Sequence, residues 1–180
     1  MRKWITVLAS SLPLALLAVT MSHGQQAADP ALQAQLKRLF PEAARFSPKE
    51  GNPAHFKAYG PAAAGKEPEL LGLAWWTTEV EPLERGYDGP IKMLVGMDPT
   101  GILKGLIVTE HREPYGDFSV DPPEFAAQFK GKNIREPFKV GQDIDAVSRA
   151  TITITSASRA VRNSSRRIAR ELLAPPKQQP

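Results

Sequence analysis

The chain has 180 residues, a typical length for one folded domain with a single hydrophobic core. Its formal net charge is +4, and without Arg2 and Lys3 it is +2, so the composition does not indicate binding to nucleic acid. The chain contains no cysteine, which excludes disulfides, iron–sulfur clusters and zinc sites built on thiolates.

The N-terminus has the pattern of a secretory signal peptide. Arg2-Lys3 form a short positive region, Ile5 to Val19 is largely apolar, and Ser22-His23-Gly24 provides small residues for cleavage. We expect residues 1–24 to be cleaved rather than kept as a membrane anchor, because the apolar run is shorter than the roughly 20 residues that span a bilayer. The protein is therefore expected in the periplasm, free or associated with the membrane. No twin-arginine pair is present near the start, which favours export of an unfolded chain that receives any cofactor afterwards.

Residues 25–69 are expected to form an amphipathic helix followed by an irregular connection. Asp29-Pro30 is a favourable helix start, apolar residues then recur at helical spacing, and Pro41 ends the helix. The segment from Arg45 to Pro68 is rich in Pro and Gly and has little periodicity. Within it the sequence predicts only a short strand, at His55 to Tyr59.

The middle of the chain predicts three strands. Leu70 to Thr78 is apolar nearly throughout, and its Trp75-Trp76 pair is either core or a stacking surface for an aromatic ligand. Ile91 to Met97 alternates apolar residues on one face, Asp98 to Gly101 has the residues of a type I turn, and Ile102 to Thr109 returns as the partner strand. The fold class predicted from this hairpin and the following helices is α+β, an antiparallel sheet with helices packed on it.

Hydroxyl groups are concentrated near the C-terminal end of the domain. From Thr151 to Thr155 threonines alternate with isoleucines, and at strand spacing this places the hydroxyls on one face and the isoleucines on the other. The pattern becomes helical from about Ser156 to Leu173. The hydroxyls are therefore expected at the N-terminus of a helix, where unpaired N–H groups and the helix dipole favour an anion such as phosphate.

The predicted last helix carries an apolar stripe and a basic face. A solvated surface is the commonest explanation of such a face, and contact with an acidic redox partner or a membrane complex is the alternative. Five arginines form this face: Arg159, Arg162, Arg166, Arg167 and Arg170.

The stretch before this helix resembles the flavinylation motif Asp-x-x-Ser/Thr-Gly-Ala-Thr of the FMN-binding domain family. Asp145, Ser148, Ala150 and Thr151 match the motif. In this family the last Thr is esterified to the phosphate of FMN by a flavin transferase. Arg149 replaces the usual Gly, which removes backbone freedom, although the planar guanidinium suits phosphate oxygens.

Other segments resemble the same family in the same order along the chain. Gly86-Tyr87-Asp88-Gly89-Pro90-Ile91 is similar to a family loop, and His111 and Glu113 lie in a partial match to the loop that contacts the flavin. The resemblance implies that Gly86, Tyr87, His111 and Glu113 line the ring, and that Lys132 lies near the phosphate or the ring edge. Alternatively, His111 bonds to the backbone at a strand end. Glu113 and Lys132 would then simply be exposed to solvent.

The resemblance covers residues 70–173, and residues 174–180 are expected to form a polar tail. It implies an exported electron-transfer flavoprotein with FMN attached through its phosphate to Thr151, where Ser148, Arg149, Ala150 and Thr153 surround the phosphate. A flavin transferase would load the cofactor, and a membrane-bound or periplasmic protein would exchange electrons with it. No catalytic or metal-binding residue is predicted, since the protein is expected to be a redox carrier.

Two other functions stay open on the sequence. The first is a regulatory or interaction module of the same fold that binds FMN non-covalently or not at all, which the replacement of Gly by Arg149 favours. The second is a structural protein whose basic last helix docks on a membrane complex. A hydrolase is not indicated, because none of the three histidines belongs to a nucleophile motif.

Overall fold

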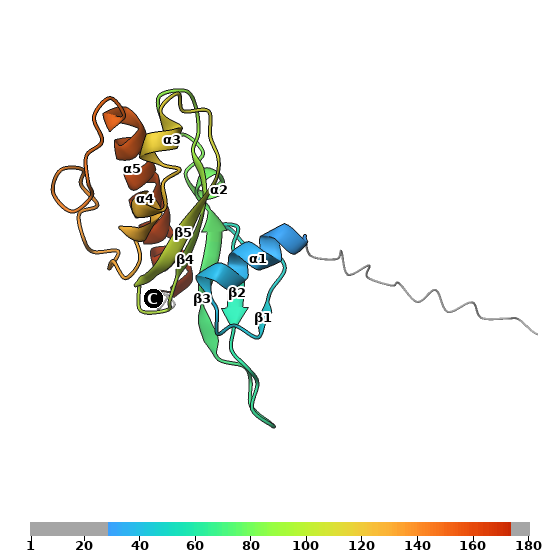
Figure 1. Cartoon of the computed structure of the whole chain (residues 1–180). Helices are drawn as coiled ribbons and strands as arrows, with labels where there is room; N and C mark the ends of the chain where they lie inside the picture. The colour runs from blue at the N-terminus through green and yellow to red at the C-terminus, as the bar shows by residue number, and fades with distance from the viewer. Residues whose placement is uncertain (1–28, 174–180) are drawn as a thin grey trace, which may run out of the picture.

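The computed structural model describes residues 29–173, which form an antiparallel sheet with helices on both faces (Figure 1). The predicted signal peptide (1–24) and polar tail (174–180) lie outside the described residues. The five strands follow one another across the sheet in chain order, and each is antiparallel to its neighbours. They are β1 (Arg45–Phe46), β2 (Phe56–Tyr59), β3 (Leu70–Trp76), β4 (Lys92–Met97) and β5 (Leu103–Glu110). The predicted α+β fold is therefore confirmed.

The helices differ greatly in length, and the longest begins with the hydroxyl-rich segment. They are α1 (Pro30–Leu39), α2 (Thr77–Val80), α3 (Gly116–Ser119), α4 (Pro123–Ala127) and α5 (Thr151–Ile168), which continues into a π-helical turn at Ala169–Leu173. As predicted, Asp29 caps α1, since its carboxylate accepts a hydrogen bond from the N–H of Ala31 at 2.9 Å.

Both faces of the central strands are buried, which explains their nearly continuous apolar sequence. In β3, Trp75 contributes to the core beneath α5, whereas Trp76 belongs to the cluster on the opposite face, beneath α1. In β4, Met93 and Val95 face the α5 side and Leu94 faces α1. The sheet therefore separates two hydrophobic clusters, with α1 on one side and α4 and α5 on the other (Figure 1).

The predicted hairpin is confirmed. Strands β4 and β5 pair along most of their length, and the turn between them is closed by a hydrogen bond from the N–H of Gly101 to the carbonyl of Asp98 at 3.1 Å. The Asp98 carboxylate also accepts hydrogen bonds from the N–H groups of Thr100 and Ile102, as short polar side chains do at the start of turns. The strand β2 is confirmed, whereas β1 was not predicted.

The predicted strand spacing of Thr151 to Thr155 is wrong, because these residues form the first turns of α5. The helix therefore begins five residues before Ser156. The core-facing residues Ile154, Ala157, Val161 and Ile168 are three, four and seven residues apart, and this helical spacing packs them against the sheet. The β-branched residues favour strands locally, but burial of this stripe outweighs that preference.

Candidate functional site

The N-terminus of α5 exposes a set of backbone donors. Ala150 precedes the helix and no side chain caps it, and the first intrahelical hydrogen bond is donated by the N–H of Ile154 to the carbonyl of Ala150 at 3.0 Å. The N–H groups of Thr151, Ile152 and Thr153 therefore have no acceptor within the helix. Since Thr151 is also exposed, its hydroxyl lies where a helix favours an anion.

A pocket of about 320 Å³ opens beside this turn. One wall comes from the start of α5 and the residues just before it, and the other from two loops that are distant in sequence. Its volume is at the small end of the range of ligand pockets, roughly 300–1,000 Å³. The residues that line it are Tyr87, Pro114, Tyr115, Arg149, Ala150, Thr151, Ile152 and Thr153.

The rim of this pocket is apolar and exposed. Tyr87 is 69% exposed and Ile152 is 58% exposed, and Tyr115 is also exposed beside them. The ring of Phe118 packs on that of Tyr115 with 5.3 Å between centroids. Four of the five large exposed apolar side chains of the described residues thus belong to the pocket or contact it. Apolar exposure gathered at one place is typical of a binding site for a ligand or a partner.

Arg149 has the left-handed backbone conformation, with φ of 67°. This conformation costs a non-glycine residue about 1 kcal/mol, which accounts for the Gly at the equivalent place in the resembled motif. The side chain of Arg149 is exposed and lines the pocket. Arg149 therefore has a strained backbone that glycine would not have, but it places a guanidinium beside Thr151.

Glu113 holds the two walls of the pocket together. Glu113 is 6% exposed, and its carboxylate accepts hydrogen bonds from the N–H groups of Tyr87 at 2.9 Å and Asp88 at 3.0 Å. It also accepts a hydrogen bond from the hydroxyl of Thr153 in α5. A Cβ at Gly86 would lie 2.4 Å from Oε1 of Glu113, so glycine is required there for the loop to approach the carboxylate. Gly86 and Glu113 thus act on the pocket through its walls.

His111 lies behind Glu113, away from the pocket. Its Nδ1 accepts a hydrogen bond from the N–H of Glu113 at 3.1 Å, and its Nε2 donates to Oδ1 of Asp121 at 2.7 Å. A Cβ at Gly116 would lie 2.1 Å from Cε1 of His111, so the following loop closes tightly over the ring. The ordinary interpretation, a histidine that bonds backbone at a strand end, describes this geometry.

Lys132 lies near the loop that precedes α5, not at the pocket. It forms ion pairs with Glu136 at 3.0 Å and Asp143 at 3.3 Å. Burial acts to lower the pKa of Lys132, but the hydrogen bonds to these carboxylates outweigh burial and hold the pKa above its usual value. Ser148 is exposed one residue before Arg149 and does not line the pocket.

The tryptophan pair does not reach the pocket. Trp75 is fully buried in the core, and Trp76 lies on the other face of the sheet, with the ammonium of Lys92 4.9 Å from its ring centroid. The aromatic residues at the pocket are instead Tyr87 and Tyr115. Tyr115 was missed as a site residue, although its insertion into the partially matched loop was a visible signal.

Residues 29–173 contain neither a candidate metal site nor a candidate membrane-spanning helix. No cluster of three or more acidic or histidine side chains there could hold a metal ion. None of the helices in this range combines the length and apolarity needed to cross a membrane.

Comparison with known proteins assigns the region around this site to a family. A sequence model described as the FMN-binding domain matches residues 86–166, a range that includes every residue lining the pocket. The chain therefore carries a domain of the FMN-binding domain family, and its cofactor is FMN. The uncapped helix end, the guanidinium of Arg149 and the apolar rim fit a phosphate joined to a flat aromatic ring.

Two curated relatives share this region, and both are named Regulatory protein NosR. The one from Pseudomonas aeruginosa is 29% identical over 147 residues, which is 75% of this chain and 19% of the relative. The one from Stutzerimonas stutzeri is 27% identical over 169 residues, which is 88% of this chain and 22% of the relative. The chain thus spans about a fifth of the length of these relatives.

Proposed function

We propose that this chain is an electron-transfer flavoprotein whose FMN is attached through its phosphate to Thr151. One observation carries the proposal: the Thr151 hydroxyl is exposed on the first turn of an uncapped helix, next to a pocket within the FMN-binding domain. The geometry gives the hydroxyl access to a flavin transferase, which a buried side chain would not have.

The chain's own residues would hold the phosphate. The N–H groups of Ile152 and Thr153 are free of intrahelical acceptors and would donate to its oxygens, together with the dipole of α5. Arg149, which precedes Thr151 in the chain and lines the same pocket, would donate two N–H groups of its guanidinium to the phosphate oxygens. Ser148 and Ala150 complete the turn, with Ser148 near enough in sequence to reach the phosphate from solvent.

The apolar rim would hold the ring. Tyr87, Tyr115 and Ile152 present exposed apolar surface next to the phosphate site, and burying that surface under a flat ring is favourable. Bound FMN supplies the redox chemistry, and the protein positions it. Direct contact of His111, Glu113 or Lys132 with FMN stays a prediction, and the structure supports Glu113 and His111 more as residues that position the pocket walls.

The cellular setting is part of the same proposal. Export of an unfolded chain would require loading outside the cytoplasm by a flavin transferase, and a membrane-bound or periplasmic protein would then exchange electrons with the flavin. A regulatory module that binds FMN non-covalently is the second candidate. The strained φ of Arg149 at the motif and the regulatory name of the relatives favour it.

The deciding experiment is the mass of protein that has been exported by a host with a flavin transferase. We expect an FMN adduct on the peptide that contains Thr151, absent from Thr151→Val and retained in Thr155→Val, which changes an exposed threonine one turn further along α5. Bare polypeptide mass in the wild type, with yellow colour lost on denaturation, would contradict covalent attachment and support the second candidate.

A further inference from the structure

The outer edge of β5 carries a groove that the flavin site does not use. Strand β5 is the last strand of the sheet, and only its first residues are covered, by backbone hydrogen bonds between Leu103 and the segment Gly131–Lys132. Beyond Leu103, no other strand of residues 29–173 pairs with this edge. The backbone groups along the outer edge are therefore available to a further strand.

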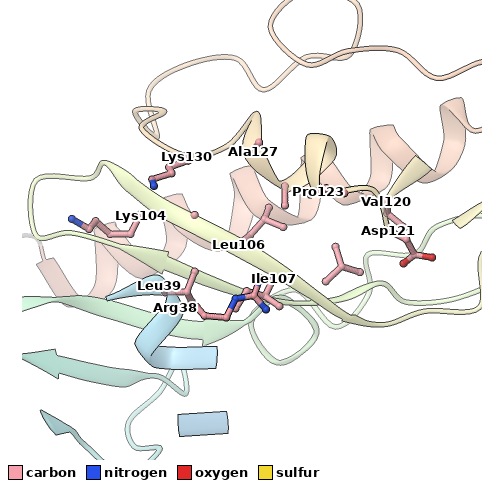
Figure 2. A pocket seen from close by; sticks show the side chains of 13 residues that line it. Arg38, Leu39, Lys104, Leu106, Ile107, Val120, Asp121, Pro123, Ala127 and Lys130 are labelled. Carbon is pink, nitrogen blue, oxygen red and sulfur yellow. The ribbon is translucent and has the colours of Figure 1, made fainter. Parts of the chain in front are cut away.

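The groove has the shape of a channel along this edge. It measures about 370 Å³, and four consecutive β5 residues, Gly105–Val108, form its floor. Figure 2 shows α1 on one side and α4 on the other, with Lys104 and Lys130 at one end and Asp121 at the other. Four strand residues extend over about 13 Å, which suits an extended peptide lying alongside β5.

The charges around the groove select the partner. Arg38, Lys104 and Lys130 line it, and Asp121 is the one acidic lining residue. Lys104 is paired with Glu42 at 3.2 Å, whereas no side-chain hydrogen bond or ion pair joins Arg38 or Lys130 to another residue of the described range. Asp121 is engaged with His111. The groove thus offers two uncommitted cations next to an open strand edge.

We propose that this groove binds an extended acidic segment of a partner protein, which adds to β5 as a sixth antiparallel or parallel strand. Main-chain hydrogen bonds to β5 would supply affinity, and carboxylates facing Arg38 and Lys130 would supply selectivity. A second copy of this chain fits less well, because pairing β5 with β5 would bring two sets of these cations together.

The groove is connected to the flavin pocket by hydrogen bonds. Asp121 begins a series of hydrogen bonds through His111 and the backbone of Glu113 to the carboxylate that holds Tyr87 and Thr153. A partner bound over Asp121 therefore lies at one end of the structure that positions the pocket walls. The docking proposal itself does not depend on how FMN is attached.

The test uses the full-length exported chain and a fluorescein-labelled peptide of alternating Glu and Val. We expect saturable binding at low salt, with amide NMR shifts concentrated at Gly105–Val108. Alternating Lys and Val should not bind, and neither should an acidic peptide with proline at every second position, which cannot form a strand. Shifts concentrated on α5, equal binding of the proline peptide, or dimers of this chain through β5 would each overturn the proposal.

Variants test the charges of the groove and its open volume separately. The double reversal R38E/K130E should weaken peptide binding about tenfold or more, whereas Lys139→Glu, an exposed charge on another loop, should change it less than twofold. Ala127→Trp should block binding by filling the groove. The far-UV spectrum and unfolding midpoint of each variant show that it is folded. The remaining alternative partner is an anionic membrane surface, tested with vesicles that contain anionic lipid. Charge-dependent binding to these vesicles without binding to the acidic peptide would also overturn the proposal.

Discussion

The body of α5 and its N-terminal end differ in how their polar groups are paired. Along the body of the helix, Arg159 makes two hydrogen bonds to the carboxylate of Glu84, at 2.7 and 2.6 Å, and Arg166 donates to the carbonyls of Ile134 and Glu136, both at 2.8 Å. At the N-terminus the helix has no side-chain cap, and the residue before Ala150 has a left-handed backbone. The same helix therefore has paired arginines along its body and unpaired backbone donors at its start.

This difference separates residues that bond to their own domain from residues whose polar and apolar groups are open to a ligand. The basic face of α5 suggested a docking surface, yet Arg159, Arg166 and Arg167 bind loops and helices of their own domain. The start of α5 looked like a strand, yet there the structure leaves donors, strain and apolar surface exposed. Unpaired donors, backbone strain and exposed apolar surface gathered at one place are expected at a binding site. If the contrast holds, substitutions in these two parts of the molecule should differ in their effects on stability and on flavin binding.

The largest effect is expected from Glu113→Ala. The substitution removes the acceptor for the N–H groups of Tyr87 and Asp88 and for the Thr153 hydroxyl, which are then left without this partner. We expect a loss of about 3 kcal/mol in the free energy of unfolding, measured by urea denaturation. Glu110→Ala is the matched control, since its side chain is 75% exposed and its ion pair with Lys92 is weak, at 3.7 Å. Equal losses in the two variants would show that Glu113 does not hold the pocket walls.

How much of this site follows from sequence depends on the range of the interaction involved. The turn at Asp98 and the cap at Asp29 were predicted because each depends on neighbouring residues. The role of Glu113 was not, because it joins residues 26 and 40 positions away in the chain. The helical start of α5 was missed for a related reason. Only packing of Ile154 against the sheet decides between helical and strand spacing there.

The second prediction concerns the ion pair on the body of α5. The hydrogen bonds from Arg159 hold the pKa of Glu84 below its usual value, despite the opposing effect of burial. A carboxyl group with a lowered folded-state pKa stabilises the fold above its unfolded-state pKa of about 4.3, and this contribution is lost as the pH falls through the lower folded value.

Arg159→Ala should therefore lower stability by about 1 kcal/mol at pH 7. The difference from wild type should shrink as the pH falls below the unfolded-state pKa and vanish below the lowered folded-state pKa of Glu84. Denaturant titrations at several pH values measure this. Arg170→Ala, which changes an exposed arginine near the end of the helix, should have little effect at any pH. A difference from wild type that persists unchanged in acid would mean that Arg159 stabilises α5 by packing and not through Glu84.

The third prediction tests whether the strain at the start of α5 is retained for binding. Arg149→Gly relieves the left-handed backbone, so the free energy of unfolding should rise by about 0.5 kcal/mol after the added flexibility of the unfolded chain is counted. Non-covalent affinity for FMN should fall about tenfold, because a charged partner of the phosphate is lost, while affinity for riboflavin stays the same. Arg112→Ala is the control for loss of a positive charge, because Arg112 is exposed and does not line the pocket. If both ligands weaken equally in Arg149→Gly, the guanidinium does not face the phosphate.

The smallest change in stability is expected at the rim, from Ile152→Ser. An exposed apolar residue contributes little to folding, so the free energy of unfolding should stay within about 0.5 kcal/mol of wild type. Leu83→Ser is a matched control, because Leu83 is also apolar and is 92% exposed, far more than Ile152 at 58%. The two variants should differ only in the flavin-loaded protein. There, Ile152→Ser should make flavin fluorescence more accessible to iodide quenching, while Leu83→Ser leaves it unchanged, because only Ile152 lines the pocket beside Thr151. Equal quenching in both would place the ring elsewhere on the domain and reduce the start of α5 to a phosphate anchor.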